Sequence, residues 1–205
     1  FSALARDVYL DVLHDCGVSK RDTSLIEQAW FGNVGMGQWG QGGIRGQVCF
    51  TPMVEEGIFP ERVPFINVEG GCATASLAFH GAWKDILSGQ SQVSLAVGVE
   101  KLLSPDYPPR VQAIFNTAID QLMPARWHDY YRRAGEEVGK SFETGPDRTV
   151  FMDTYAMQAA WHMAKYGTTQ RQIAIGASKN HRHGSLNPKA QYQFEVTVEE
   201  VLADR

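Results

Sequence analysis

The chain has 205 residues, 43% of them hydrophobic, which is enough apolar material for one large domain or for a domain with an insertion. A formal net charge of −4 gives it no electrostatic means of attracting nucleic acid or an anionic membrane, so we expect neither as a partner. It contains no run of about 18 apolar residues, which excludes a transmembrane helix.

The first part of the chain predicts an alternation of helices and strands. Hydrophobic periodicity indicates a helix over residues 1–16, a strand over 26–32 and a second helix over 45–56. Residues 32–46 are rich in glycine and too irregular for either period, which predicts a loop. Its GMGQWG run has the spacing of a dinucleotide-binding turn, but more glycines follow where a helix should begin, so we do not expect a nucleotide there.

A single cysteine lies between a strand and a helix in the next part of the chain. Residues 63–68 form a β-branched and aromatic run that predicts a buried strand, and residues 73–88 have helical spacing up to Gly89. Cys72 therefore lies at a helix start, where unpaired N–H groups and the helix dipole favour a thiolate over a thiol. This makes Cys72 a candidate nucleophile. The alternative is a packing residue, because unpaired cysteines are among the most often buried side chains.

The three cysteines, Cys16, Cys49 and Cys72, are odd in number, far apart and without the spacing of a metal site. We expect free thiols and therefore a reducing compartment, which would be the cytoplasm, or the peroxisome in a eukaryote. The N-terminal residues also lack the basic and then apolar order of a signal peptide.

Residues 93–100 are a short apolar run that predicts a buried parallel strand and completes a βαβ unit. The composition then changes from residue 102 to residue 147, where five prolines interrupt the chain: Pro105, Pro108, Pro109, Pro124 and Pro146. We interpret this segment as an insertion packed over the core. Four of its basic residues lie between aromatic ones: Arg126, Arg132, Arg133 and Lys140. This pattern fits either a surface that binds phosphate and adenine or a solvated helix face.

Helices with capping boxes are predicted in the last part of the chain. Residues 149–166 indicate one helix, and a second begins after Thr169, which has a glutamine three residues on, and runs to about His181. His181 and His183 lack a third metal ligand nearby and precede a Gly-Ser-Leu-Asn-Pro run, so we expect a polar turn there and not a metal site. A further capping box at residues 197–200 begins a helix close to the last residue.

These elements together predict an α/β layered fold, in which helices cover a mixed β-sheet and a loop domain is inserted. We expect three segments: a core over 1–101, the insertion over 102–150 and the remainder of the core over 151–205. The chain opens directly in helical periodicity without a methionine and stops just after a capping box. We therefore expect a piece of a longer polypeptide whose sheet is incomplete.

An ordered set of motifs carries a family resemblance. The motifs are GGIRGQ at 42–47, EGGCATAS at 69–76, GVEK at 98–101, KNHRH at 179–183 and NPKAQ at 187–191. In this order they resemble the first half of the thiolase family, and more closely its sterol-carrier-protein-X branch, which includes thiolase-like lipid-transfer acyltransferases. The resemblance covers nearly the whole chain, and the ordered set is more specific than any single member.

The resemblance implies a layered fold of two similar halves, with a loop domain that covers coenzyme A inserted in the first half. Residues 1–101 and 151–205 would belong to the N-terminal half, without its first strand, and residues 102–150 would be the loop domain. The resemblance also implies a homodimer, an acyl-CoA substrate, and Cys72 as the residue that carries the acyl group as a thioester. Coenzyme A would be a substrate, with no cofactor bound covalently and no metal.

The reaction implied is thiolytic cleavage or Claisen condensation of a 3-oxoacyl-CoA that carries a fatty acyl or sterol side chain. In this family the remaining acid, base and oxyanion groups come from the second half, so the 205-residue chain alone is expected to be inactive. Two alternatives stay open. One is a retro-aldol lyase of steroid side-chain 3-hydroxyacyl-CoA that works with a zinc-ribbon and OB-fold partner, and the other is a non-catalytic protein that binds acyl-CoA or lipid.

Overall fold

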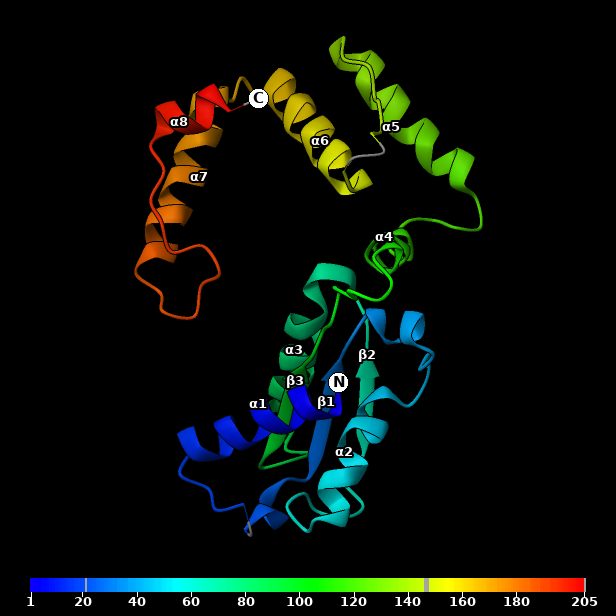
Figure 1. The fold of residues 1–205 in the computed structure, drawn as a ribbon, viewed down its shortest axis with the longest axis vertical. Helices are drawn as coiled ribbons and strands as arrows, with labels where there is room; N and C mark the ends of the chain where they lie inside the picture. Colours follow the sequence, from blue (N-terminus) through cyan, green and yellow to red (C-terminus); the bar gives the residue numbers. More distant parts are fainter. Residues whose placement is uncertain (21, 146–147, 205) are drawn as a thin grey trace. The chain divides into compact units, whose positions relative to one another are not determined.

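The computed structural model describes residues 1–20, 22–145 and 148–204 and forms two compact units, Phe1–Ile119 and Asp120–Arg205 (Figure 1). The boundary between the units falls inside the segment that we expected to be an insertion, and the division into three segments stays a prediction. Pro146 and residue 147 of that segment, like Arg205 at the end of the last one, lie outside the described residues.

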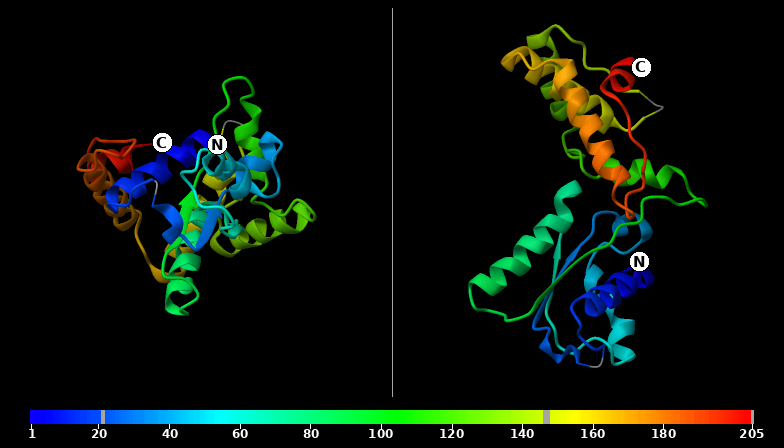
Figure 2. Two further views of the ribbon diagram at one scale, coloured as in Figure 1. Left: turned by 90° about the horizontal axis from the view of Figure 1, so that it is seen from below. Right: turned by 90° about the vertical axis from the view of Figure 1, so that its left-hand side faces the viewer.

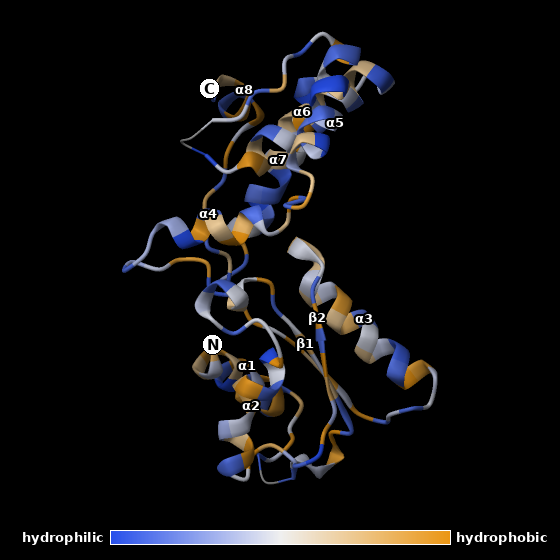
Figure 3. Cartoon of the chain, turned by 90° about the vertical axis from the view of Figure 1, so that its right-hand side faces the viewer, coloured by the Kyte–Doolittle hydropathy of each residue, from blue (hydrophilic) through white to orange (hydrophobic). Residues whose placement is uncertain are grey.

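The first unit is built on a three-stranded parallel sheet, which confirms the α/β fold class. Its elements are α1 (Ser2–Asp15), η1 (Thr23–Leu25), β1 (Gln28–Gly32), η2 (Gly35–Trp39), α2 (Arg45–Glu55), β2 (Phe65–Val68), η3 (Gly71–Ala73), α3 (Thr74–Leu87), β3 (Ser94–Gly98) and α4 (Pro109–Asn116). The strand order is β2-β1-β3. Helices α1 and α2 lie on one face of the sheet and α3 lies on the other, as Figures 2 and 3 show.

The three strands are buried to different depths. Ala29 of the central strand β1 pairs with Phe65 of β2 and with Leu95 of β3. Strand β2 lies at an edge, and none of its residues is fully buried; Ile66 is 38% exposed. The other edge strand, β3, does bury Leu95 and Val97. The expectation that residues 63–68 form a buried strand was therefore wrong about burial, because α3 covers β1 and β3 and only just reaches β2.

Aromatic rings fill the space between the sheet and helices α1 and α2. The Phe50 ring on α2 is the centre of this cluster, with ring centroids 5.6 Å from Tyr9, 6.4 Å from Phe31 and 4.8 Å from Phe59. The buried Tyr9 hydroxyl donates a hydrogen bond of 2.9 Å to the carbonyl oxygen of Ile58, so its polar group has a partner inside the core. This cluster joins α1, α2 and β1 into one apolar core.

Helix α3 is attached to the opposite face of the sheet by one glycine and one buried carboxylate. A Cβ atom at Gly81 would lie 2.5 Å from the Trp30 ring, so only a glycine allows the helix this close to the ring. The Asp85 carboxylate accepts hydrogen bonds from the Trp30 indole at 2.6 Å and from the Ser94 hydroxyl at 2.8 Å. These contacts bind α3 to both β1 and β3.

The outer side of α3 stays open in this chain. Ala78 and Ala82 are buried against the sheet, whereas large apolar side chains elsewhere on the helix are exposed: Leu77, Phe79, Trp83, Ile86 and Leu87. Figure 3 shows hydrophobic colour along this helix. An apolar surface of this kind is typical of a helix that another part of a protein covers.

The second unit contains α5 (Pro124–Val138), α6 (Val150–Tyr166), α7 (Gln170–Ser185) and α8 (Val198–Ala203), and it packs α5 on α6 and α7 on α8. The two predicted capping boxes are confirmed, at Thr169 before α7 and at Thr197 before α8. Among the described residues, no helix combines the length and the apolar character that crossing a membrane requires.

The polar turn expected at His181 and His183 was wrong, because α7 continues through both residues to Ser185. The segment that follows α7 folds back along it. The Ser178 hydroxyl donates to the Val196 carbonyl oxygen at 2.7 Å, and the His181 ring lies 5.1 Å from that of Phe194. These contacts come from residues far along the chain and stabilise the last turns of the helix.

Gly81→Ala tests the attachment of α3 to the sheet. We expect its free energy of unfolding to fall by about 1–3 kcal/mol, because the added methyl group meets an indole that the Asp85 hydrogen bond holds in place. Gly176→Ala on α7 is the control, since a Cβ atom there has nothing within 4 Å and removes backbone freedom from the unfolded chain. Urea unfolding followed by circular dichroism measures both, and equal stabilities would contradict the packing described.

Tyr9 makes stability depend on pH in the alkaline range. Burial raises the pKa of Tyr9 to about 12, against about 10 for an exposed tyrosine. The folded state therefore holds a proton that the unfolded state releases, so this contribution is complete below about pH 10 and is lost as the pH rises to about 12. We expect the wild type to lose about 2–3 kcal/mol more than Tyr9→Phe over this interval in urea unfolding. If the free energies of unfolding of the wild type and of Tyr9→Phe changed by the same amount between about pH 10 and about pH 12, the raised pKa of Tyr9 would be contradicted.

Candidate active site

The candidate site is built where the three parallel strands end. Their carboxyl ends meet at one edge of the sheet, where ligands bind in open α/β folds. Asn33 follows β1, the segment from Glu69 to Ala73 follows β2, and Val99 and Glu100 follow β3. All of the polar groups described next belong to these three strand ends or contact them.

Cys72 is the middle residue of η3 (Gly71–Ala73), the short helix that leads directly into α3, and its side chain is exposed. The turn that holds it is closed by hydrogen bonds to Thr74. The Gly70 N–H donates to the Thr74 hydroxyl oxygen at 2.9 Å, and that hydroxyl donates to the Gly71 carbonyl oxygen at 2.6 Å. Gly71 has φ +59°, a conformation that glycine adopts without strain. The thiol is thus presented at a helix start, as the sequence predicted.

Two glycines at the strand ends fix where α3 begins. A Cβ atom on Gly32, the last residue of β1, would lie 2.9 Å from Thr74 Cγ2. A Cβ atom on Gly98, the last residue of β3, would lie 2.8 Å from the Ala75 Cβ. The first turn of α3 therefore packs directly on the backbone of both strands. Because only Ala73 separates Cys72 from this turn, the same contacts determine the position of the thiol.

The carboxylate of Glu100 organises the other side of this edge. Its Oε2 accepts hydrogen bonds from the backbone N–H groups of Val34 at 2.9 Å and Gly35 at 3.0 Å. Its Oε1 accepts from the Lys101 N–H at 3.0 Å and from the Asn33 side-chain amide at 3.2 Å. A carboxylate with this many donors is a strong anchor for the backbone around it. It binds the glycine-rich segment after β1 to the end of β3.

Asn33 connects the same elements from β1. Its side-chain amide donates to the Val99 carbonyl oxygen at 2.7 Å, and its side-chain oxygen accepts from the Met36 N–H at 2.9 Å. Asn33 is 1% exposed, so every one of these bonds lies away from water. Neither Asn33 nor the role of Glu100 was found from the sequence. The only available signal was their position directly after a strand.

The GGIRGQ motif also receives a structural explanation. The Arg45 guanidinium donates to the Asn33 carbonyl oxygen. The Gly46 N–H donates to the Asn67 side-chain oxygen at 2.7 Å, and the Asn67 amide donates to the Gln47 side-chain oxygen at 2.9 Å. These bonds connect the first turn of α2 to β2 and to the end of β1. The motif therefore supports the same sheet edge on which Cys72 lies.

The three cysteines differ in their surroundings, and all are free thiols. Cys49 is 1% exposed, and burial raises the pKa of its thiol. Cys16 is exposed at the end of α1, whereas Cys72 is exposed at the start of α3. The packing alternative considered for Cys72 therefore describes Cys49 instead. Cys72 is the exposed thiol that also has a helix start beside it.

Two of the basic residues singled out in the insertion, Arg132 and Arg133, are occupied by ion pairs on their own helix. On α5, Arg132 forms ion pairs with Asp129 at 2.5 Å and with Glu136, and Arg133 contacts Asp129 at 3.0 Å. These pairs are exposed and lie on one helix, which favours the solvated helix face over a phosphate site. In the part of the chain that the structure describes, no three His, Cys, Asp or Glu side chains are grouped so as to hold a metal ion.

The sequence is similar to one family model and to several known proteins whose names agree with that model. A model described as the thiolase N-terminal domain matches residues 1–201. An acetyl-CoA acetyltransferase of Methanothermobacter thermautotrophicus is 28% identical over 202 residues, which are 98% of this chain and 45% of the relative. The benzoylsuccinyl-CoA thiolase subunit BbsB of Thauera aromatica is 25% identical over 205 residues, covering 100% of this chain and 44% of the relative. Sterol carrier protein 2 of Bos taurus is 30% identical over 183 residues, 89% of this chain and 29% of the relative.

The chain thus spans less than half the length of these relatives. The part that it matches includes all of the strand ends described above, because the similarity to the first two relatives extends over nearly every residue of the chain. The resemblance seen in the ordered motifs and the match to the family model cover the same residues.

Thr74→Val tests the turn that presents the thiol. Valine keeps the shape of threonine but removes the hydroxyl, leaving the Gly70 N–H and the Gly71 carbonyl without that partner. We expect the free energy of unfolding to fall by about 1–2 kcal/mol. Thr74→Ser keeps the hydroxyl and is the matched control, with a smaller loss in the same urea unfolding measurement. If the serine variant proved the less stable of the two, the hydrogen bonds would not be what holds the turn.

Proposed function

Because this chain belongs to the thiolase family through its N-terminal domain, we propose that Cys72 is the acyl-carrying nucleophile of a thiolase-type acyl-CoA acyltransferase. The observation that carries the proposal is the exposed thiol in η3, directly before α3 at the carboxyl edge of the sheet. A helix start provides unpaired N–H groups and a partial positive charge, which favour negative charge that develops beside them. The exposed sulfur lies where a carbonyl carbon can reach it and, once deprotonated, can attack that carbon.

The proposed reaction is thiolysis of a 3-oxoacyl-CoA. The Cys72 sulfur attacks the C3 carbonyl carbon and forms a thioester, and the C2–C3 bond breaks with its electron pair going to C2. This carbon takes a proton and leaves as acetyl-CoA. The thiol of a second coenzyme A gives up its proton and attacks the thioester, which releases the shortened acyl-CoA and restores the thiolate. Claisen condensation is the same sequence in the opposite direction.

The proposal assigns different tasks to this chain and to the rest of the protein. This chain supplies the nucleophile and the rigid edge that holds it, through Thr74, Asn33 and Glu100. The proton donor, the base and the oxyanion groups are proposed to come from the second half of the longer polypeptide. Coenzyme A acts as a substrate, and residues 102–150 are proposed to cover it.

The substrate class is proposed from the family and from the names of the relatives. Acetyl-CoA acetyltransferase and benzoylsuccinyl-CoA thiolase are both named for an acyl-CoA, and sterol carrier protein 2 is named for a lipid. We take a 3-oxoacyl-CoA with a fatty acyl or sterol side chain as the class that agrees with both. A thioester on Cys72 is the step that all of these substrates would share.

The proposal includes an assembly and a compartment. The open apolar side of α3 and the edge strand β2 both need cover, and we propose that the second half covers the helix while a second copy completes a homodimer. Three free cysteines agree with a reducing compartment such as the cytoplasm. An OB-fold partner belongs only to the alternative in which the protein is a retro-aldol lyase.

Intact-mass spectrometry of the full-length protein tests the nucleophile. After incubation with a 3-oxoacyl-CoA, we expect an added mass equal to one acyl group, together with a shortened acyl-CoA when coenzyme A is supplied. Cys72→Ala should abolish the adduct and lower the turnover at least about 1,000-fold, as loss of a catalytic nucleophile does. Cys16→Ala is the matched control, because that thiol is also exposed but lies at a helix end, and it should keep the adduct.

The same experiment separates the alternatives. An adduct that survives in Cys72→Ala would overturn the assignment of the nucleophile. Retro-aldol cleavage of a 3-hydroxyacyl-CoA that persists in this variant would identify the lyase. Binding of acyl-CoA with neither an adduct nor a product would identify a protein that binds without turnover.

A further inference from the structure

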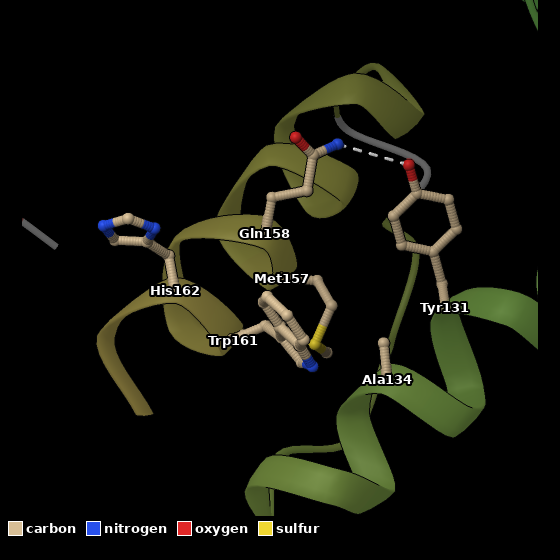
Figure 4. Close-up of a pocket in the computed structure, with 6 residues that line it drawn as sticks. All are labelled: Tyr131, Ala134, Met157, Gln158, Trp161 and His162. Carbon is tan, nitrogen blue, oxygen red and sulfur yellow. Dashed lines mark hydrogen bonds between the residues drawn. The ribbon is translucent and has the colours of Figure 1, made fainter. Parts of the chain in front are cut away.

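A groove between α5 and α6 is lined by residues of the second unit, whereas the strand ends that hold Cys72 belong to the first. Its α5 wall lies in residues 102–150, the segment that we propose covers coenzyme A. The groove has a volume of about 470 Å³ and is lined by Tyr131, Ala134, Met157, Gln158, Trp161 and His162 (Figure 4). This volume lies within the range of roughly 300–1,000 Å³ that is usual for small-molecule sites. We refer to it as the α5–α6 groove. None of the residues that line the groove takes part in the step proposed for Cys72.

The aromatic walls of the groove are already fixed in place. The Tyr131 ring stacks on Phe142 with centroids 5.0 Å apart and also contacts Trp127 at 5.2 Å. The Trp161 indole donates a hydrogen bond of 2.9 Å to Glu137, which sets the orientation of that ring. Side chains that are ordered before a ligand arrives lose little entropy on binding. The groove therefore presents two preorganised flat surfaces.

The floor is apolar and its depth depends on a small residue. Met157 is 2% exposed, and a Cβ atom on the neighbouring Gly135 would lie 3.1 Å from its Cε, so the two helices are in close contact beneath the groove. Ala134 lines the groove beside this contact, and its single methyl group leaves the space above the floor open. A thioether next to aromatic walls favours ring-shaped ligands, because sulfur contacts ring edges favourably.

The groove has few polar groups, and two of them, the Gln158 amide and the Tyr131 hydroxyl, lie together at one end. The Gln158 amide donates to the Tyr131 hydroxyl oxygen at 3.3 Å, which is long for such a bond and so is readily exchanged for a bond to a ligand. The His162 ring contacts Tyr166 at 4.8 Å. None of the six lining residues is an aspartate, glutamate, lysine or arginine. Charged groups that contact the Trp161 wall are Glu137, which accepts the indole N–H, and Lys165, whose Nζ lies 4.3 Å from the centroid of the Trp161 ring. The lining itself is uncharged, and this favours an uncharged ligand inside the groove.

We propose that the α5–α6 groove binds an uncharged, flat ring system of about two fused rings that carries one hydroxyl or keto group. The rings lie between Tyr131 and Trp161 on the Met157 floor, and the oxygen lies beside Tyr131 and Gln158. A flexible alkyl chain fills the same space less well, because it loses rotational freedom on binding and makes no ring-to-ring contact.

Binding of 2-naphthol to the full-length protein tests the proposal, with octan-1-ol as the flexible ligand that carries the same hydroxyl group. We expect isothermal titration calorimetry to give an affinity for 2-naphthol at least about tenfold above that for octan-1-ol. In Ala134→Leu the added carbons occupy the groove, and the affinity for 2-naphthol should fall at least about tenfold. Ala156→Leu makes the same change at an exposed position of α6 outside the lining, and its affinity should stay within about twofold.

A measurement on the wild type keeps the test decisive if Ala134→Leu does not fold. In ¹H–¹⁵N spectra the indole signal of Trp161 should move on addition of 2-naphthol, whereas that of Trp30, which is bonded to Asp85 in the first unit, should not. Trp161→Phe and Trp30→Phe assign the two signals. The proposal is overturned if the Trp161 signal stays in place at saturation, if octan-1-ol binds as tightly, or if a folded Ala134→Leu binds as the wild type does.

Discussion

The structure of the candidate site depends on the close approach of α3 to the ends of β1 and β3. Gly32 and Gly98 allow it, because a side chain at either position would collide with Thr74 or Ala75. The contact places the first turn of α3 directly on the sheet edge, and Cys72 precedes that turn. A cysteine on a mobile loop could be just as exposed, but its thiol would have no fixed position. Here the backbone packing supplies that position.

Hydrogen bonds from polar side chains also hold the segments at this sheet edge together. Glu100 and Asn33 bind the glycine-rich segment after β1 to the end of β3, and Asn67 binds α2 to β2. Glu100 and Asn33 satisfy backbone groups just after the strands end, and Asn67 satisfies the Gly46 N–H in the first turn of α2. On the opposite face, Asp85 joins Trp30 and Ser94 to α3. The edge is thus held by hydrogen bonds on each of its strands, and a fixed geometry of this kind is what the proposed thioester step requires.

Much of the local structure could be predicted from the sequence, and the exceptions share one cause. The helix starts at Thr169 and Thr197 were found because a capping box is complete within four residues. The length of α7 was underestimated because its last turns contact Val196 and Phe194, which no local pattern shows. The burial of β2 was overestimated because composition does not show which strands a helix covers, and α3 covers β1 and β3 much more than β2. Asn33 and Glu100 were missed because their bonds join residues more than sixty positions apart.

The sequence by itself determined the α/β class, the family, the boundaries of most helices and the position of Cys72 at a helix start, because these follow from periodicity, capping and motifs among neighbouring residues. The tertiary structure alone decided that β1 is the central strand and that Cys49 is buried while Cys72 is exposed. It also decided that Tyr131 and Trp161 line one groove. These facts depend on which distant residues meet, and that is settled only when the whole chain packs.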